Sequence, residues 1–339
     1  PQTIRIDGSI AYVVNSGSNN IQRLDLETGT NTKAFVRFVT ADGERPTNPW
    51  GLALFRRQNR LFGLVSGNLD DSLLIVDLEG GVVEARLRDG FDAPQAVVVE
   101  GDLGFVANTA YRYPSWGEGS VSVVDLASRT VVHRLPTCAR NPQNLVVTPD
   151  WLFVVSTGAL RDEGGRFLPA ESGCVDVYER AGIEHAVGPL YSVTVAPNLE
   201  RPSIGAPIGA ALTLDGHWLY LSSATSAALF VIDLDQRTLR RGSDDPILLA
   251  DSDDNELLSL RRHSTGELLV LRYNRDQLLV LEPDPTLEAP VRRTIELGEH
   301  PTELEGPVDL AVSGERVFVV MGISNRIVSV DLSGGATSL

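Results

Sequence analysis

Six aspartates recur along the chain at intervals of about fifty residues. Each follows a short apolar run and precedes a more polar stretch, and the six are Asp25, Asp77, Asp125, Asp176, Asp233 and Asp331. Carboxylates at such even spacing could form a metal-binding or acid–base ring. A carboxylate just before a turn also accepts hydrogen bonds from the backbone N–H groups of that turn. Because the equivalent seventh position carries Glu282 followed by Pro283, we interpret the aspartates as structural.

A second group of polar residues adjoins prolines that recur at a similar spacing. These segments read Asn48-Pro49-Trp50, Ala93-Pro94-Gln95, Asn141-Pro142-Gln143-Asn144, Ala206-Pro207-Ile208 and Gly306-Pro307-Val308-Asp309. Proline fixes the backbone where the chain turns, which explains the prolines themselves. It does not explain the amide, aromatic and acidic neighbours, which could bind a ligand if the fold brings them together.

Short strands must position these residues. Runs of four to eight residues rich in Val, Ile, Leu and Phe end at Gly, Asp, Asn or Pro, a pattern typical of strands. No stretch longer than about ten residues keeps a helical apolar period. The runs fall into seven groups of four, although the last group shows only three clear runs. Such sheets bury both faces only when they are arranged radially, so we predict an all-β, seven-bladed β-propeller with four-stranded antiparallel blades.

The whole chain, residues 1–339, forms one propeller domain in this prediction. The blades are expected at approximately 1–45, 46–90, 91–138, 139–200, 201–250, 251–300 and 301–339. Either Gly334–Leu339 or the residues before Ile4 must complete the last blade, and the sequence leaves both possibilities open.

In a propeller the innermost strands begin around the mouth of the central channel. Trp50, Gln95, Gln143 and Asn144 are therefore candidate ligand-binding residues at that mouth. The alternative is a divalent-metal-dependent enzyme of the lactonase or lyase kind, with Ca²⁺ or Mg²⁺ held by oxygen ligands from Asn48, Asn144, Glu256 and Asp309. The acidic run 251–256 lacks the spacing of a calcium-binding EF-hand, and we interpret it as a solvated loop.

Two connections on the same expected face are unusually long, Thr109–Gly119 and Thr157–Gly173. Long loops in a compact domain often carry function. The first contains the large aromatic residues Tyr111, Tyr113 and Trp116. Such side chains can anchor a protein partner or stack on a sugar, or they can fold over their own blade as a lid.

The two cysteines, Cys138 and Cys174, stand in neighbouring loops of that face. A disulfide between them would hold the longer loop in place and would fit an oxidising compartment. Two buried thiols are the alternative. The five histidines do not converge in this arrangement, which disfavours a copper or iron site and a catalytic triad.

The first and third groups of strands resemble the YVTN-type repeats of bacterial and archaeal surface and periplasmic propellers. The residues that carry the resemblance are Tyr12-Val-Val-Asn15, Phe105-Val-Ala-Asn108, Val121-Ser-Val-Val-Asp125 and Asn141-Pro142. The resemblance implies a seven-bladed exported protein with no assured activity.

A net charge of −16 argues against binding to nucleic acid, and no apolar run is long enough to cross a membrane. A chain that begins at Pro1 is expected to be a mature or trimmed product, with any export signal or anchor missing. We therefore expect a non-catalytic binding or scaffold propeller, periplasmic, cell-surface or secreted and without a cofactor. It would recognise a protein partner or glycan through its loops.

Overall fold

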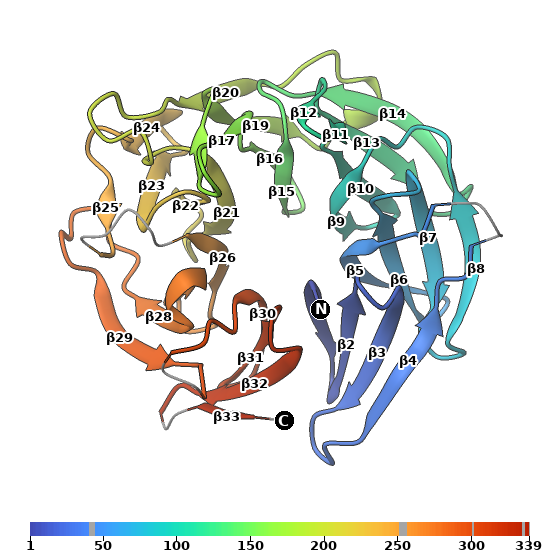
Figure 1. Ribbon diagram of the computed structural model, residues 1–339. Coiled ribbons are helices and arrows are strands. Elements are labelled where there is room, and N and C mark those ends of the chain that lie inside the picture. The colour runs from blue at the N-terminus through green and yellow to red at the C-terminus, as the bar shows by residue number, and fades with distance from the viewer. Residues whose placement is uncertain (41–44, 251–255, 300–301, 334–335, 339) are drawn as a thin grey trace.

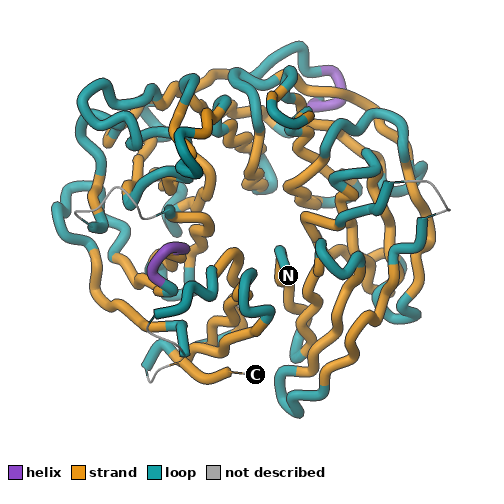
Figure 2. The backbone as a smooth tube through the Cα atoms, viewed as in Figure 1, coloured by secondary structure: helices purple, strands orange, loops and turns teal. Residues whose placement is uncertain are grey.

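The computed structural model describes residues 1–40, 45–250, 256–299, 302–333 and 336–338. They form seven antiparallel sheets arranged as blades around a central opening (Figure 1), which confirms the predicted β-propeller. The helices among these residues are two short 3₁₀ turns, η1 (Ile183–His185) and η2 (Tyr273–Arg275), drawn in purple in Figure 2. Neither is long enough to cross a bilayer.

Each blade uses four consecutive main strands, with the first strand innermost. Blade 1 contains β1 (Thr3–Asp7), β2 (Ile10–Asn15), β3 (Asn20–Asp25) and β4 (Asn31–Arg37). Blade 2 contains β5 (Pro49–Arg57), β6 (Arg60–Gly67), β7 (Ser72–Asp77) and β8 (Val82–Leu87). Blade 3 contains β9 (Pro94–Glu100), β10 (Leu103–Asn108), β13 (Ser120–Asp125) and β14 (Thr130–Pro136). Blade 4 contains β15 (Pro142–Val147), β16 (Trp151–Ser156), β19 (Gly173–Glu179) and β20 (Tyr191–Val195).

The remaining blades repeat this order. Blade 5 contains β21 (Pro207–Leu212), β22 (Trp218–Ser223), β23 (Ala228–Asp233) and β24 (Thr238–Arg241), with β25 (Ile247–Leu248) also pairing with β23. Blade 6 contains β26 (Leu257–Arg262), β27 (Leu268–Arg272), β28 (Gln277–Leu281) and β29 (Val291–Glu296). Blade 7 contains β30 (Pro307–Ser313), β31 (Arg316–Met321), β32 (Arg326–Asp331) and β33 (Ala336–Ser338).

The core is divided among the junctions between blades. Seven apolar clusters are present, one between each pair of neighbouring blades. The second and third strands of each blade carry most of the buried residues, because neighbouring blades cover both of their faces. Fully buried Phe105, Phe230 and Phe318 each contribute about 1.5–3 kcal/mol to folding.

The C-terminal segment completes the last blade, which settles the alternative that the sequence left open. Strand β33 pairs with β32, while β1 at the N-terminus is the innermost strand of blade 1. No strand crosses from blade 1 to blade 7 among the described residues. The ring closes instead through an apolar cluster that joins Ile4, Val13 and Leu24 to Phe318 and Val320, and blades 1 and 7 lie side by side in Figure 1.

The recurring aspartates have the expected structural role in most blades. Asp25 Oδ1, for example, accepts hydrogen bonds from the backbone N–H groups of Glu27 and Thr28, at 3.0 and 2.9 Å. Asp176 is different. The strand register places Glu179, not Asp176, at the end of β19, so the Val175–Val177 phrase matches the other blades in letters but is three residues out of register.

Candidate functional site

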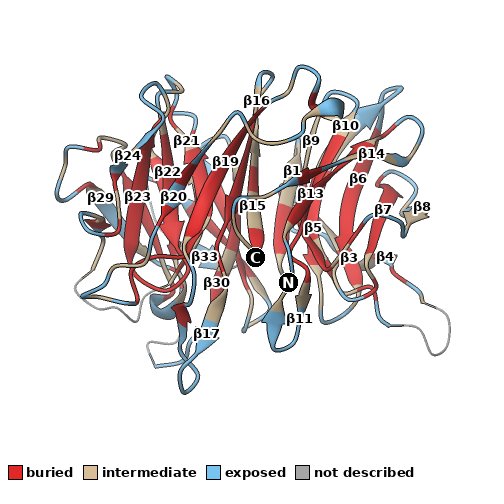
Figure 3. Cartoon of the chain, turned by 90° about the horizontal axis from the view of Figure 1, so that it is seen from above, coloured by how far each residue is buried: buried red, intermediate tan, exposed pale blue. Residues whose placement is uncertain are grey.

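One face of the ring carries both long loops. In an antiparallel blade, the connection between the second and third strands lies at the same end as the connection to the next blade. We call this end the loop face. Figure 3 shows β11 (Tyr111–Arg112) and β17 (Leu160–Asp162) projecting from the same edge of the ring.

The first long loop is an ordered hairpin, in which β11 pairs with β12 (Ser115–Trp116). The rings of Tyr111 and Trp116 pack on each other with centroids 4.8 Å apart, and both side chains are half-buried. Arg112 forms ion pairs with Asp71 at 2.8 Å and Asp92 at 2.7 Å, which fasten the hairpin to its neighbours. Tyr113 stands at the tip and is 88% exposed. Two of the three aromatic side chains thus support the hairpin, and the third faces solvent.

The second long loop is also a hairpin, formed by β17 and β18 (Phe167–Pro169). Arg161 spans it by donating a hydrogen bond from Nη1 to the carbonyl oxygen of Pro169, at 2.8 Å. Leu168 is buried at its base, whereas Phe167 is 49% exposed. Sequence reasoning singled out this loop by length and missed Phe167, which is its exposed aromatic residue.

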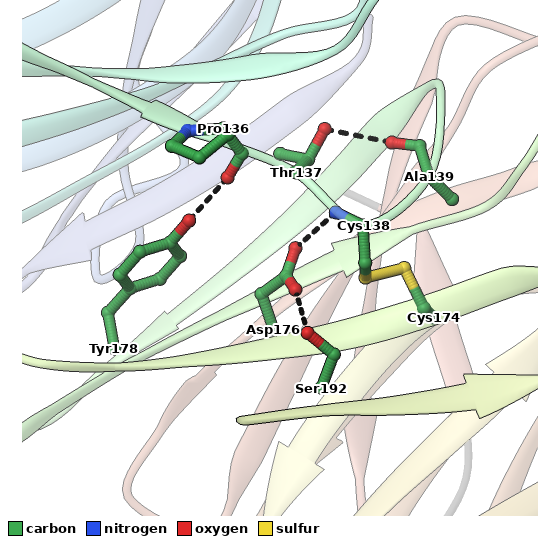
Figure 4. The surroundings of a disulfide bond; sticks show 8 residues. All are labelled: Pro136, Thr137, Cys138, Ala139, Cys174, Asp176, Tyr178 and Ser192. Atoms are coloured by element: carbon green, nitrogen blue, oxygen red, sulfur yellow. Dashed lines mark hydrogen bonds between the residues drawn. A yellow bond between two sulfur atoms is a disulfide. The ribbon is translucent and has the colours of Figure 1, made fainter. Parts of the chain in front are cut away.

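The predicted disulfide between Cys138 and Cys174 is present (Figure 4), with Cα atoms 6.3 Å apart. It joins the connection between blades 3 and 4 to the start of β19, immediately after the second hairpin. Beneath it, Asp176 accepts hydrogen bonds from the N–H of Cys138 at 2.7 Å and from the hydroxyl of Ser192 at 2.5 Å. Burial raises the pKa of Asp176 despite these bonds. The disulfide therefore fixes the base of the hairpin to two blades.

The centre of the ring is a cavity of about 770 Å³, lined by the innermost strands. Trp50, Gln143, Asn144 and Asp309 are among its lining residues. A ligand-binding role for Trp50, Gln143 and Asn144 stays a prediction. Gln95 lies elsewhere. Its side chain is buried outside the set of cavity-lining residues, and its Oε1 has no hydrogen-bond partner among the described residues.

Residues before the inner-strand prolines share one backbone conformation. Asn48, Ala93, Asn141, Ala206 and Gly306 all have positive φ, between 44° and 68°. The carbonyl oxygen of each accepts a hydrogen bond from the N–H of the first residue after the second strand. The side chain of Asn48 donates to the carbonyl oxygen of Ser16, at 3.4 Å, and is not among the cavity-lining residues. Its position therefore serves the turn into the blade, where Asn and Gly tolerate this φ best.

Asp309 is the centre of a charged cluster in the cavity wall. Its Oδ2 accepts hydrogen bonds from Arg5 Nη1 at 2.7 Å and from the N–H of Ile4 at 3.3 Å. Its Oδ1 accepts hydrogen bonds from Arg261 Nη2 at 3.0 Å and from the hydroxyl of Ser259 at 3.2 Å. Burial acts to raise the pKa of Asp309, but the charges of Arg5 and Arg261 outweigh it and hold the pKa below its ordinary value. The carboxylate thus links blades 6, 7 and 1.

The residues proposed as metal ligands are only partly brought together. Asn144 and Asp309 line the cavity, whereas Asn48 and Glu256 are not among its lining residues. Two guanidinium groups on Asp309 disfavour a divalent cation at that carboxylate. Residues 251–255 of the acidic run lie outside the described residues. Among the described residues, the one group of three possible His, Cys, Asp or Glu ligands contains the disulfide sulfurs and Asp176.

Arg5 and Arg261 were missed by sequence reasoning, although both line the cavity. The signal was present in the repeat. Aligning the inner strands places both arginines at a position where the other blades carry Ala or Val.

Comparison with known proteins gives the fold alone. No family model matches the chain, and no curated protein matches it, so the resemblance to YVTN repeats stays a prediction. A chain of hydrazine synthase from Kuenenia stuttgartiensis is structurally similar, with a TM-score of 0.72 over 96% of this chain and 93% of that chain. The two sequences are only 13% identical, so the structural similarity shows a common fold and nothing further.

Proposed function

We propose that the protein is a non-catalytic, exported binding propeller whose loop face recognises a protein partner or a glycan. The observation that carries the proposal is the hairpin β11–β12, which presents Tyr113 at 88% exposure on a base fixed by the ion pairs of Arg112. A rigid support lowers the entropy lost when an aromatic side chain is immobilised in a complex. These features support a role for the hairpin as an anchor in a complex.

Other exposed apolar side chains are concentrated on the same face. In the part of the chain that the structure describes, seven large apolar residues at least 41% exposed lie in connections of the loop face: Val39, Leu69, Tyr113, Phe167, Leu199, Leu304 and Ile323. Among the described residues, the turns of the opposite face hold three, namely Val187, Leu190 and Leu214, and Val82 begins β8 at that end. Apolar and aromatic groups left in water on one face are typical of a recognition surface.

Export is supported by the disulfide. Such bonds persist in oxidising compartments and are rare in the cytosol. The bond between Cys138 and Cys174 fixes the loop face itself, so the proposed binding surface depends on an oxidising environment. A periplasmic, cell-surface or secreted protein fits this requirement.

Substitution on the two faces tests the proposal. We expect Tyr113→Ser combined with Phe167→Ser to weaken retention of the purified protein on a glycan array, or of its partner in affinity capture, at least tenfold. The control is Val187→Ser, which removes a side chain 98% exposed on the opposite face. Equal binding by the loop-face variant and the control would overturn the proposal.

The metal-dependent lactonase- or lyase-like enzyme remains the alternative prediction. Elemental analysis of the native protein, with thermal melting before and after chelation, separates the two functions, because a bound ion stabilises the folded state by mass action. A stoichiometric divalent ion and a large fall in Tm on chelation would support the enzyme. No ion and no shift would support the binding propeller.

A further inference from the structure

The strand pairings place one residue of every inner strand at the same level of the channel. Each pairs with a large apolar or aromatic residue of the second strand in its blade. In blade order the seven are Arg5, Ala53, Val98, Val146, Ala211, Arg261 and Ala311. The other five blades have Ala or Val at this position and still pack in the same way. Packing of the inner strand therefore does not require an arginine there.

The arginines lie on either side of blade 7, in blades 1 and 6. Blade 7 carries the small residue Ala311 at the same level and Asp309 two residues earlier. Both guanidinium groups therefore converge on one carboxylate, at 2.7 Å for Arg5 and 3.0 Å for Arg261. Two positive charges against one negative charge leave a net positive cluster in the cavity wall.

Part of each guanidinium group remains free. Nη1 of Arg5 donates to Asp309 and to the carbonyl oxygen of Ile4, while its Nε and Nη2 have no hydrogen-bond partner among the described residues. Nε of Arg261 is likewise without a partner there, whereas its other two nitrogens donate to Asp309 and Leu260. Both side chains are 31% exposed, and neither has a fully buried unpartnered nitrogen, so the free N–H groups face open space in the channel.

Among the described residues, the remaining charge in the cavity does not neutralise the cluster. The charged residues of that part of the chain that line the cavity are Arg5, Arg261, Arg262 and Asp309, in a chain whose net charge is −16. The guanidinium group of Arg262 donates to the carbonyl oxygens of Leu212 and Thr213, at 3.1 and 2.9 Å. The inner wall is thus locally positive in an acidic protein, which favours an anionic occupant.

Apolar groups form most of the ring of residues nearest the loop face. Ile208, Leu258 and Val308 line the cavity one residue after the start of their strands, and the half-buried indole of Trp50 stands at the same position in blade 2. Blade 4 interrupts this largely apolar ring with Gln143. An occupant must therefore pair its anionic group with the arginines and its hydrocarbon part with this ring. A volume of about 770 Å³ admits a small organic molecule.

We propose that the channel binds a small organic carboxylate, with its carboxylate group on Arg5 and Arg261 and its hydrocarbon part against the apolar ring. The free Nε and Nη2 of Arg5 form one edge of a planar guanidinium group, which matches a carboxylate with paired hydrogen bonds that are stronger and more directional than those of an ammonium group. Arg261 adds a single donor, its Nε. Asp309 positions both guanidinium groups. This site is separate from the proposed recognition surface on the loop face, and either can fail without the other.

Calorimetry on the full chain tests the proposal with acetate, benzoate, succinate and glutarate. Chloride and inorganic phosphate at matched ionic strength serve as reference anions. We expect at least one carboxylate to bind with one-to-one stoichiometry and to raise the Tm, with benzoate favoured over acetate because of its ring. Failure of all four carboxylates to bind more tightly than chloride, or binding of phosphate alone, would overturn the proposal.

Two substitutions locate the site. Arg261→Val, which installs the residue found at this level in blades 3 and 4, is expected to weaken carboxylate binding at least tenfold. Arg261→Lys keeps the charge but loses the Nε donor held in place by the planar guanidinium group, so an intermediate affinity is expected. Arg56→Val is the control, because Arg56 pairs with Asp7 outside the cavity. Unchanged affinity in Arg261→Val would contradict the assignment.

A measurement on the unaltered chain covers the case in which a variant fails to fold. Phenylglyoxal modifies accessible guanidinium groups, and mass spectrometry quantifies the modification at each arginine. The bound carboxylate is expected to protect Arg5 and Arg261 while leaving Arg56 reactive. Equal modification of all three with and without the carboxylate would overturn the proposal.

Discussion

The junction between blades 3 and 4 and the junction between blades 7 and 1 hold the ring together by different means. At the first, the chain is continuous, and a disulfide between Cys138 and Cys174 adds a covalent link. At the second, no strand connects the first and last blades among the described residues, and closure depends on an apolar cluster together with the contacts of Asp309 to Ile4 and Arg5.

Each junction also contains a buried aspartate, in an opposite electrostatic setting. Asp176 lies beneath the disulfide with neutral partners, and burial raises its pKa. Asp309 is buried between two arginines, whose charges hold its pKa below the ordinary value. At the first junction, a disulfide and a buried aspartate with neutral partners hold the base of the second hairpin. At the second junction, which we call the ionic closure, Asp309 and its two arginines join the blades and line the channel.

Loss of Asp309 is expected to have the largest effect. Asp309→Ala leaves two guanidinium groups facing each other and removes the acceptor for the N–H of Ile4, so the free energy of unfolding should fall by about 3–5 kcal/mol. Urea denaturation measures it. The control is Asp7→Ala, which breaks an exposed pair with Arg56 and should cost about 1 kcal/mol or less. Similar losses in both variants would show that the ionic closure contributes no more than a surface pair.

Reduction of the disulfide should have the next largest effect. The two cysteines are separated by 36 residues, and opening a loop of this length is expected to lower the free energy of unfolding by about 4 kcal/mol. Thermal melting of the wild type with and without reductant measures the change. A Cys138→Ser, Cys174→Ser variant should melt at the lower temperature and ignore the reductant. A wild-type Tm that does not respond would mean that the first junction is held by its apolar contacts alone.

The two aspartates should give opposite pH dependence. A raised folded-state pKa means that Asp176 favours the fold most in acid and loses that contribution as the pH rises through the folded pKa. The Tm of Asp176→Asn relative to wild type should therefore increase from acid to neutral pH. Because the pKa of Asp309 is lowered, its stabilisation is present at neutral pH and lost as the pH falls through the folded pKa. The deficit of Asp309→Asn should shrink in acid, and parallel profiles for both variants would contradict this contrast.

A single hydroxyl at the first junction should have the smallest effect. Tyr178 donates a hydrogen bond to the carbonyl oxygen of Pro136, close to the disulfide, so Tyr178→Phe should cost about 1 kcal/mol (Figure 4). The equally buried hydroxyl of Tyr220 has no partner among the described residues, and Tyr220→Phe should be neutral or stabilising. Urea denaturation measures both free energies of unfolding. Equal losses in the two variants would show that the hydrogen bond to Pro136 does not stabilise the fold.

The repeat period and the apolar runs were sufficient to predict the fold, because every blade must bury the same strands. Details of register were harder. The phrase at Val175–Val177 resembles those of other blades, but the strand pairing assigns the equivalent position to Glu179. The sequence of this strand can be aligned with the other blades in two ways that differ by three residues. Both alignments place apolar residues in the core, so the sequence alone does not choose between them. The sequence did not decide whether β33 completes the last blade, because a strand of three residues is too short to show an apolar pattern.

The candidate sites were predicted unevenly for a related reason. Loop length pointed to both hairpins, yet which aromatic side chain faces solvent depends on how Tyr111 and Trp116 pack together. Arg5 and Arg261 lie 256 residues apart and meet only because blades 1 and 6 flank blade 7. Neither arginine belongs to a local motif. They stand out only when equivalent positions of the inner strands are compared across the blades.

A pair of photo-crosslinkers tests the central claim most directly. A crosslinking amino acid is introduced in place of Tyr113 on the loop face or of Val187 on the opposite face, which are 88% and 98% exposed. The protein is then irradiated in cells that express it naturally. Our account predicts a specific adduct, to a protein or a glycan, from position 113 and none from position 187. Adducts of equal yield from both positions, or from position 187 alone, would contradict the assignment of the loop face as the binding surface.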